Sequence, residues 1–151
     1  MNLENKIKRR IKKYNPRGDL IQTAKVILSL SSVRHPKVKI HSERAALLAE
    51  EVAIRLKMDA KAAFFAMLLH DAGKVLLPPK YFDGRDITAE EYKEVKEHAI
   101  LGAMIFKSLH MFIFLCSGIH HAMYDRGYGL TIEDFPKHLS LKTIKKILEI
   151  C

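Results

Sequence analysis

The chain has 151 residues, of which 48% are hydrophobic, so it is long enough to bury the core of one domain. No apolar run is both long enough and free enough of charge to span a bilayer, and the N-terminal residues show no apolar stretch typical of a signal peptide. These absences predict a cytoplasmic protein. The formal net charge of +9 predicts attraction to anions such as nucleic acid, acidic partners or phosphorylated small molecules.

Much of the positive charge lies near the two ends of the chain. The clusters comprise Lys6, Lys8, Arg9, Arg10, Lys12 and Lys13 at one end, and Lys137, Lys142, Lys145 and Lys146 at the other. We interpret them as solvated helix faces in preference to a nucleic-acid site. The first cluster has only a narrow apolar stripe, Ile7 and Ile11, which disfavours insertion into a membrane.

Helical periodicity dominates the sequence and predicts an all-α fold, since few segments alternate as strands do. In the N-terminal half we expect helices over about residues 3–14, 20–31 and 36–58, then one that is capped by Asp59 and runs to His70. The third of these has apolar residues at helical spacing, which mark its expected buried side: Val38, Ala45, Leu48, Val52 and Leu56.

The C-terminal half begins with an irregular stretch from Pro78 to Asp86. Thr88 and Glu91 have the spacing of a capping box, which predicts a helix to about Leu109. A further apolar helix is expected over 111–123, a glycine-containing loop over 125–129, and a last helix that Ser140 caps.

The dipeptide His70-Asp71 ends an apolar helix and combines two side-chain types that bind borderline divalent metals. Adjacent residues diverge by about 100° around a helix. They could therefore serve one ion if the helix ends there, or Asp71 could bridge two ions. Gly73 suits a helix C-terminus, and Lys74 follows as a cation that could pair with a phosphate oxygen.

The adjacent pair His120-His121 poses the same geometric question, and His41 and His98 each lie in a separate predicted helix. Two adjacent ligand pairs with two further histidines predict a metal site. The other three histidines, His35, His110 and His138, have no partner motif, and we expect them to be structural or exposed.

Taken together, these segments resemble the HD superfamily of metal-dependent phosphohydrolases, and in finer detail its HD-GYP branch. The resemblance rests on four pieces, in order: His41-Ser42-Glu43-Arg44, Leu69 to Lys74, Glu97 to Ala103, and His120-His121 with Asp125 to Gly129. It divides the chain into a basic helical segment packed on the core, residues 1–33, and an HD/HD-GYP-like domain, residues 34–151.

The resemblance implies an all-helical HD-domain bundle and a signalling enzyme, a phosphodiesterase acting on cyclic di-GMP or a related nucleotide. It implies two divalent metal ions, iron or manganese first, with zinc, nickel or magnesium also compatible. Asp71 and Lys74 would be catalytic, and Lys74 would contact the scissile phosphate. The implied metal ligands are His41, His70 and Asp71 for one ion, with Asp71 bridging to a second ion bound by His98, His120 and His121.

Three departures from the branch keep alternatives open. Lys37 stands where the branch usually has a glutamate. The glycine-containing loop over 125–129 is one residue shorter than in the branch, and Gly129 stands in place of a proline. The last metal-binding aspartate of the family would follow Cys151, so the domain is cut short there or the site lacks one ligand. The alternatives are a different nucleotide substrate and a degenerate, non-catalytic HD-type signalling or interaction domain. As partner we expect a phosphorylated small molecule, with no membrane and no nucleic acid; a homodimer stays open.

Overall fold

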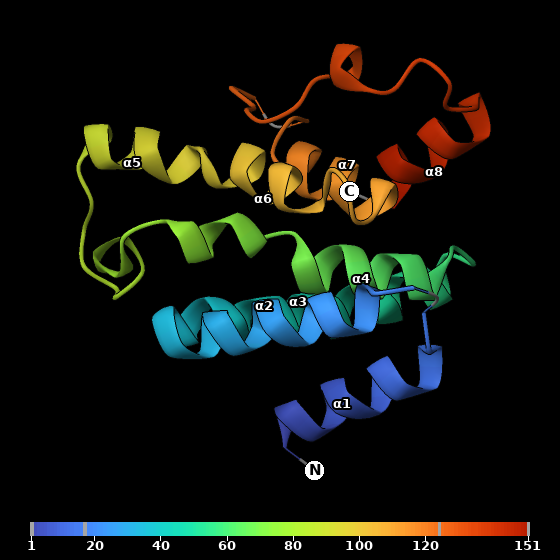
Figure 1. The fold of residues 1–151 in the computed structure, drawn as a ribbon, viewed down its shortest axis with the longest axis horizontal. Helices are drawn as coiled ribbons and strands as arrows, with labels where there is room; N and C mark the ends of the chain where they lie inside the picture. The colour runs from blue at the N-terminus through green and yellow to red at the C-terminus, as the bar shows by residue number, and fades with distance from the viewer. Residues whose placement is uncertain (1, 17, 124, 151) are drawn as a thin grey trace.

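The computed structural model describes residues 2–16, 18–123 and 125–150, and this part of the chain is helical without strands (Figure 1). The predicted all-α fold is confirmed. The expected end of the domain at Cys151 lies outside the described residues. The α-helices are α1 (Leu3–Tyr14), α2 (Leu20–Arg34), α3 (Pro36–Arg55), α4 (Ala60–Leu69), α5 (Ala89–Lys96), α6 (His98–Phe106), α7 (Met111–Ile119) and α8 (Leu141–Ile150).

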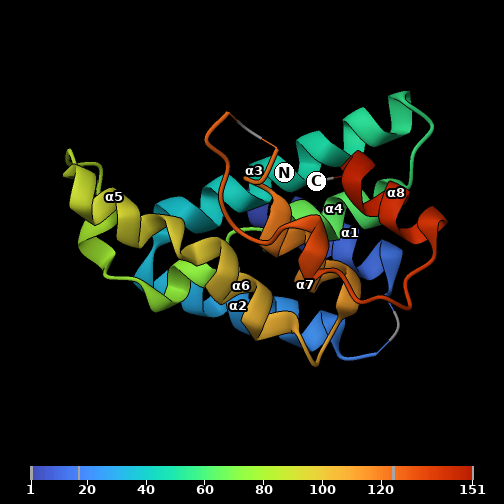
Figure 2. The ribbon, with the colours of Figure 1, turned by 90° about the horizontal axis from the view of Figure 1, so that it is seen from above.

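The helices stack in layers, which Figures 1 and 2 show from two directions. Helix α1 lies on the opposite side of the molecule from α5, α6 and α7, with α2, α3 and α4 between them. The closest packing is between α3 and α4, between α6 and α7, and between α6 and the 3-10 helix η1 (Ala72–Leu76). The central core includes the fully buried side chains of Phe64, Leu69, Phe106 and Leu115.

Side-chain caps begin three of the helices as the sequence predicts. Asp59 accepts a hydrogen bond from the Ala62 amide at 2.9 Å, and Ser140 accepts one from the Thr143 amide at 3.2 Å. Thr88 and Glu91 form a complete capping box at the start of α5. Each such cap stabilises its helix by about 1 kcal/mol.

Two predicted helices end earlier than expected. The segment expected to run from Thr88 to Leu109 is two helices, α5 and α6, that meet at Glu97. The imidazole of His98 bonds the backbone carbonyl of Val95 at this break. The segment expected over 111–123 ends at Ile119, so the pair His120-His121 follows the helix instead of lying within it.

The predicted buried face of α3 is confirmed at Val38 but wrong further along the helix. Leu48 and Leu56 are 66% and 63% exposed, whereas Ala46, Glu50 and Ala53 on another face are buried. Small side chains let α3 approach its neighbours closely, and the buried Glu50 carboxylate accepts hydrogen bonds from Arg10 and Tyr14 of α1. Apolar periodicity misplaced this face because a buried carboxylate with partners costs far less than an isolated one.

The apolar stripe of α1 is used inside the protein. Ile7 and Ile11 are 2% and 7% exposed and belong to the central core, while the lysines of the same helix point to solvent. Across the described residues, no helix has both the length and the hydrophobicity required to cross a bilayer.

Candidate metal centre

Asp71 lies at the centre of the histidine cluster, directly after the end of α4, with its side chain 1% exposed. Its Oδ2 lies 3.2 Å from Nε2 of His70 and 3.8 Å from Nε2 of His41. Its Oδ1 lies 3.2 Å from Nε2 of His98 and 3.7 Å from Nε2 of His120. The two oxygens of one carboxylate therefore face two different sets of imidazoles.

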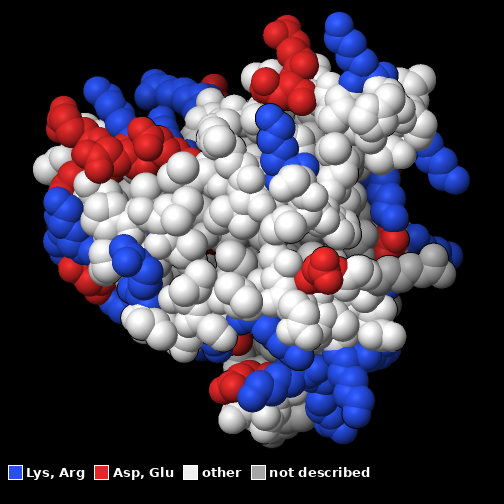
Figure 3. All heavy atoms as spheres, in the orientation of Figure 1, with Lys and Arg blue, Asp and Glu red and all other residues white. Residues whose placement is uncertain are grey.

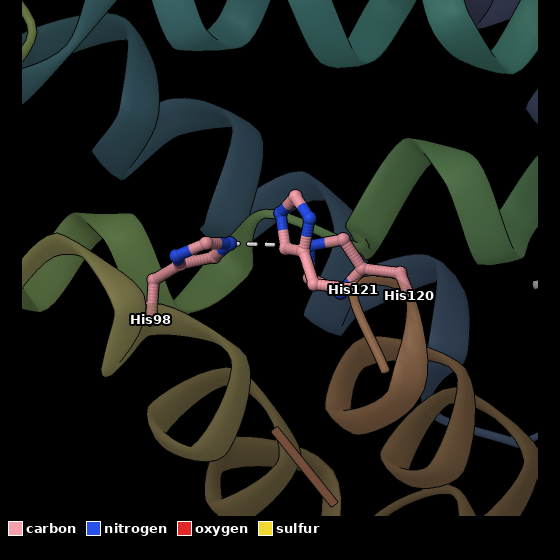
Figure 4. Close-up of side chains that lie close together, drawn as sticks. All are labelled: His98, His120 and His121. Carbon is pink, nitrogen blue, oxygen red and sulfur yellow. Dashed lines mark hydrogen bonds between the residues drawn. The ribbon is translucent and has the colours of Figure 1, made fainter. Parts of the chain in front are cut away.

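The structure brings all six predicted ligands together in two groups. His41, His70 and Asp71 form the first, and His98, His120 and His121 form the second; within each group the candidate ligand atoms lie within 4.8 Å of one another. Figure 4 shows how the second group assembles, with His98 reaching from α6 towards the pair that follows α7. Either group could hold a metal ion.

Three of the histidines each make the same kind of hydrogen bond to the backbone, and this bond sets their tautomer. Nδ1 of His70, His98 and His120 lies 2.7, 2.6 and 2.7 Å from the carbonyl oxygen of the residue three positions earlier. A carbonyl only accepts, so Nδ1 carries the proton and donates it. In the neutral ring Nε2 then presents a lone pair, which is the form that binds a metal.

The second group brings acceptor atoms together without a donor between them. Nε2 of His98 and Nε2 of His120 are 3.1 Å apart, and both approach Oδ1 of Asp71. That oxygen is buried and, among the described residues, has no hydrogen-bond partner of acceptable geometry. Two lone pairs and a carboxylate oxygen facing one another are unfavourable unless a cation lies between them, so these residues fit a divalent metal.

The electrostatics of the cluster favour the protonation states that metal binding needs. Burial lowers the pKa of His120, and burial with the neighbouring His120 and His98 lowers the pKa of His121 to about 4. Burial by itself would raise the pKa of Asp71. In the metal-free protein, protonated imidazoles of His70, His120 and His98 would attract the carboxylate and donate hydrogen bonds to it, and this outweighs burial, so the Asp71 pKa falls well below its usual value. Near pH 7 the Asp71 carboxylate is therefore ionised and the imidazoles of His120 and His121 are neutral, which are the forms that bind a metal.

Lys74 is placed beside the first group. Its Nζ donates a hydrogen bond to Oδ2 of Asp71 at 2.7 Å and lies 5.7 Å from the ring centre of Phe82. The side chain is 17% exposed, so one face of the ammonium is held by the carboxylate while the group stays near solvent. Lys37, which stands where the HD-GYP branch usually has a glutamate, donates a hydrogen bond to the carbonyl of Asp83 in the loop before α5.

Two hollows adjoin the cluster, one beside each group. His41 contributes to a hollow of about 550 Å³ that also has Lys37 and Arg44 in its wall. His121 contributes to one of about 530 Å³ with two cations, Lys96 and Arg126, one carboxylate, Asp125, and the rings of Tyr92 and Tyr128. Cationic side chains beside both groups would attract a negatively charged substrate.

Close backbone packing fixes the two groups relative to each other. That glycines allow this packing was not foreseen from the sequence. A Cβ on Gly73 would lie 2.0 Å from the carbonyl oxygen of His98, so only glycine lets η1 approach α6. A Cβ on Gly102 would lie 2.3 Å from Oγ of Ser117, which donates a hydrogen bond to the carbonyl of His70. From the sequence, Gly73 was expected to end a helix. In the structure it allows the backbone of η1 to contact that of α6. A glycine inside the apolar helix α6 was the available signal for such a contact.

The three remaining histidines lie outside both groups, as expected. His35 is buried edge-on against Phe82, His110 accepts a hydrogen bond from the Ile113 amide at the start of α7, and His138 is exposed.

The fold and the site together define a class of protein: a helical bundle with histidines and one buried carboxylate placed so that they could bind metal ions. The sequence matches the HD domain family over residues 38–129, and the chain belongs to that family. HD domains are generally metal-dependent hydrolases of phosphorylated small molecules. No curated protein and no solved structure was found to match the chain.

Proposed function

We propose that the protein is a cytoplasmic phosphohydrolase with a binuclear metal centre, in which Asp71 bridges the two ions. The observation that carries the proposal is the division of the Asp71 carboxylate, with Oδ2 towards His41 and His70 and Oδ1 towards His98 and His120. The first ion would take His41 and His70 as its other ligands. The second would take His98, His120 and His121.

Divalent ions bound at these positions would supply an activated water at neutral pH and neutralise charge on the phosphoryl oxygens. The residues of the chain do the rest. The Nδ1–H bonds of His70, His98 and His120 hold each Nε2 lone pair towards the centre, so little reorganisation is needed. Lys74 holds its ammonium beside the centre, where it can stabilise the negative charge that develops at phosphorus.

For the substrate we propose a phosphodiester of the nucleotide class. The support is the pair of cationic hollows on either side of the ligand cluster, one of which also has tyrosine rings on which a base could stack. The resemblance to the HD-GYP branch favours a cyclic dinucleotide such as cyclic di-GMP. On the same resemblance, we propose that the HD-like domain begins near residue 34 and that residues 1–33 pack on it.

Bound metal is the direct test of the proposal. Protein purified without air or chelator should hold about two iron or manganese ions per chain, and the His70→Ala variant should lose metal and turnover together. His138→Ala, which removes an exposed histidine far from any partner motif, should retain both. Full turnover in the His70→Ala variant would overturn the proposal.

The substrate requires a separate comparison. Cyclic di-GMP should be screened beside nucleoside mono- and triphosphates with the metal-loaded protein, and release of a phosphomonoester followed by chromatography. Turnover of only the mono- or triphosphates would keep the metal hydrolase and replace the substrate.

A second function, a non-catalytic signalling or interaction domain, is favoured by one specific contact. The Lys74 ammonium already neutralises Oδ2 of Asp71, so the first group is partly balanced by the chain itself. Under this alternative neither the natural protein nor the His70→Ala variant would hold metal after anaerobic purification.

A further inference from the structure

A cavity of about 680 Å³ lies between α1, α2 and the beginning of α3, away from the histidine cluster. This volume is within the range of small-molecule sites, about 300–1,000 Å³. Helices α1 and α2 precede residue 38, so two of its three walls lie outside the segment that matches the HD domain family. We propose that this cavity binds an anion with an aliphatic tail, of the fatty-acid class.

The inner wall of the cavity is aliphatic. Ile7 and Ile11 line it from α1, and Ile21 and Leu28 line it from α2. The two α1 residues are buried members of the central core, and the two α2 residues pack against that core, so the apolar wall is continuous with the protein interior. Ile7 and Ile11 are almost fully buried, so the partly buried Ile21 and Leu28 supply the aliphatic surface that a ligand can contact, and an aliphatic chain that displaces water from it would bind favourably.

The rim of the cavity carries an excess of positive charge. Its lining includes Lys8, Lys12, Lys25 and Lys39 but only two carboxylates, Glu4 and Glu43.

Both carboxylates are already engaged. Glu4 pairs with Lys8 at 2.6 Å, and Glu43 pairs with Lys39 at 2.7 Å. Among the described residues, no carboxylate lies within 4.0 Å of the ammonium of Lys12 or Lys25. In Figure 3 the lower end of the molecule, where α1 lies, is dominated by lysine and arginine side chains.

The combination of an aliphatic wall with the ammonium groups of Lys12 and Lys25, which have no carboxylate partner among the described residues, selects the ligand chemistry. A nucleic-acid phosphate would satisfy the lysines and leave the aliphatic wall facing water. A neutral lipid would cover the wall and leave the ammoniums without a partner. A carboxylate head on an aliphatic tail satisfies both parts, because the head would reach the rim while the tail lies against Ile21 and Leu28.

The cavity is distinct from the metal centre, so the two proposals can fail independently. None of the proposed metal ligands lines it. His41 lines a different hollow, with Lys37 and Arg44. Binding in the cavity can therefore be measured on the whole chain before and after removal of metal by a chelator.

Isothermal titration calorimetry with dodecanoate, kept below its micelle concentration, is the first experiment. We expect saturable binding of about one molecule per chain, with the same affinity whether or not metal is present. Butanoate has the head without the tail, and dodecyl maltoside has the tail without the charge; each should bind at least roughly tenfold more weakly. Equal affinity for either of these probes and dodecanoate would overturn the proposal.

Charge reversal at the rim localises the binding. The double variant Lys12→Glu/Lys25→Glu should weaken dodecanoate binding by roughly tenfold or more. Lys93→Glu/Lys107→Glu makes the same change in net charge at exposed lysines outside the cavity, and it should leave binding unchanged.

Circular dichroism of both double variants checks that the helices are intact. Equal weakening in the two variants would show general charge attraction and overturn the proposal. Binding to anionic phospholipid vesicles or to RNA that dodecanoate fails to compete away would assign the basic rim to that other partner and also overturn it.

Discussion

The two histidine groups around Asp71 are built from the same side chains but differ in how their charge is balanced. In the first group His41 is 61% exposed, and the Lys74 ammonium bonds Oδ2. In the second, His98 and His120 are 1% and 6% exposed, and no lysine or arginine of the described residues lies within 4.0 Å of Oδ1. Lys74 partly neutralises the first group, whereas no cationic side chain of the described residues does so for the second. We therefore expect the second to hold its metal more tightly.

Removing the Asp71 carboxylate, which both groups share, should abolish the difference in metal affinity between them. In Asp71→Asn we expect loss of metal from both positions and a fall in kcat/KM of roughly a thousandfold or more, since the bridging charge is lost. Metal analysis and steady-state kinetics measure the two effects. Retention of both ions in this variant would exclude Asp71 as the bridge.

The next largest effect should come from a substitution that moves the two histidine groups apart. In Gly73→Ala the new Cβ would meet the His98 carbonyl at 2.0 Å, so η1 and α6 must separate. We expect a loss of about 3 kcal/mol in the free energy of unfolding, by the cost of overpacking a buried contact. Urea denaturation measures it, and metal titration of the folded fraction should show weakened binding. Unchanged stability would mean that the backbone yields easily at this contact.

Removing one ligand from each group tests the predicted order of affinity. His98→Ala should weaken metal binding by about a hundredfold and His41→Ala by about tenfold, because the exposed imidazole of His41 is replaced by water at lower cost. Competition with a metal-sensitive dye gives both affinities. A larger effect from His41→Ala would reverse the comparison.

Removing the internal cation should affect only the first group. In Lys74→Met, Oδ2 loses its ammonium partner and becomes available to a metal, so affinity in the first group should rise, by about tenfold, while kcat falls. Metal affinity in the second group should be unchanged. Loss of metal from Lys74→Met would show that the lysine supports the centre instead of competing with it.

The pH dependence of the metal-free protein should identify the second group as acid-sensitive. The pKa of His121 is lowered from 6.5 to about 4, so the unfolded chain binds more protons than the folded chain between these values. The free energy of unfolding should therefore fall as the pH is lowered from 6.5 towards 4. For half-buried His121 the contribution should be on the order of 1 kcal/mol after allowance for solvent screening.

In His121→Gln this part of the fall should disappear, because the titrating group is gone. Thermal denaturation of both proteins at pH 7, 5.5 and 4 measures it. An identical pH dependence in the variant would assign the acid sensitivity to other groups, such as His120 or His41, whose pKa values burial also lowers.

Most of the helices and all three caps described above could be predicted from the sequence, because apolar period and capping residues act within a few positions of one another. The break at Glu97 and the early end of α7 at Ile119 could not. At each of these points a histidine ring, His98 or His120, bonds a backbone carbonyl while its Nε2 faces Asp71, a residue distant in sequence. The buried side of α3 was misplaced for a related reason, since the partners of Glu50 come from α1.

The sequence by itself determined the helical class, the family and the identities of the candidate ligands, because side-chain chemistry and local periodicity are written in neighbouring residues. Only the tertiary structure decided which oxygen of Asp71 faces which histidines, and that Lys74 neutralises the Oδ2 oxygen. The tertiary structure also decided that residue 73 must be glycine. It also placed an aliphatic wall and a lysine rim around one cavity. These features join residues far apart along the chain, and their distances are set by how the helices pack, which no local pattern specifies.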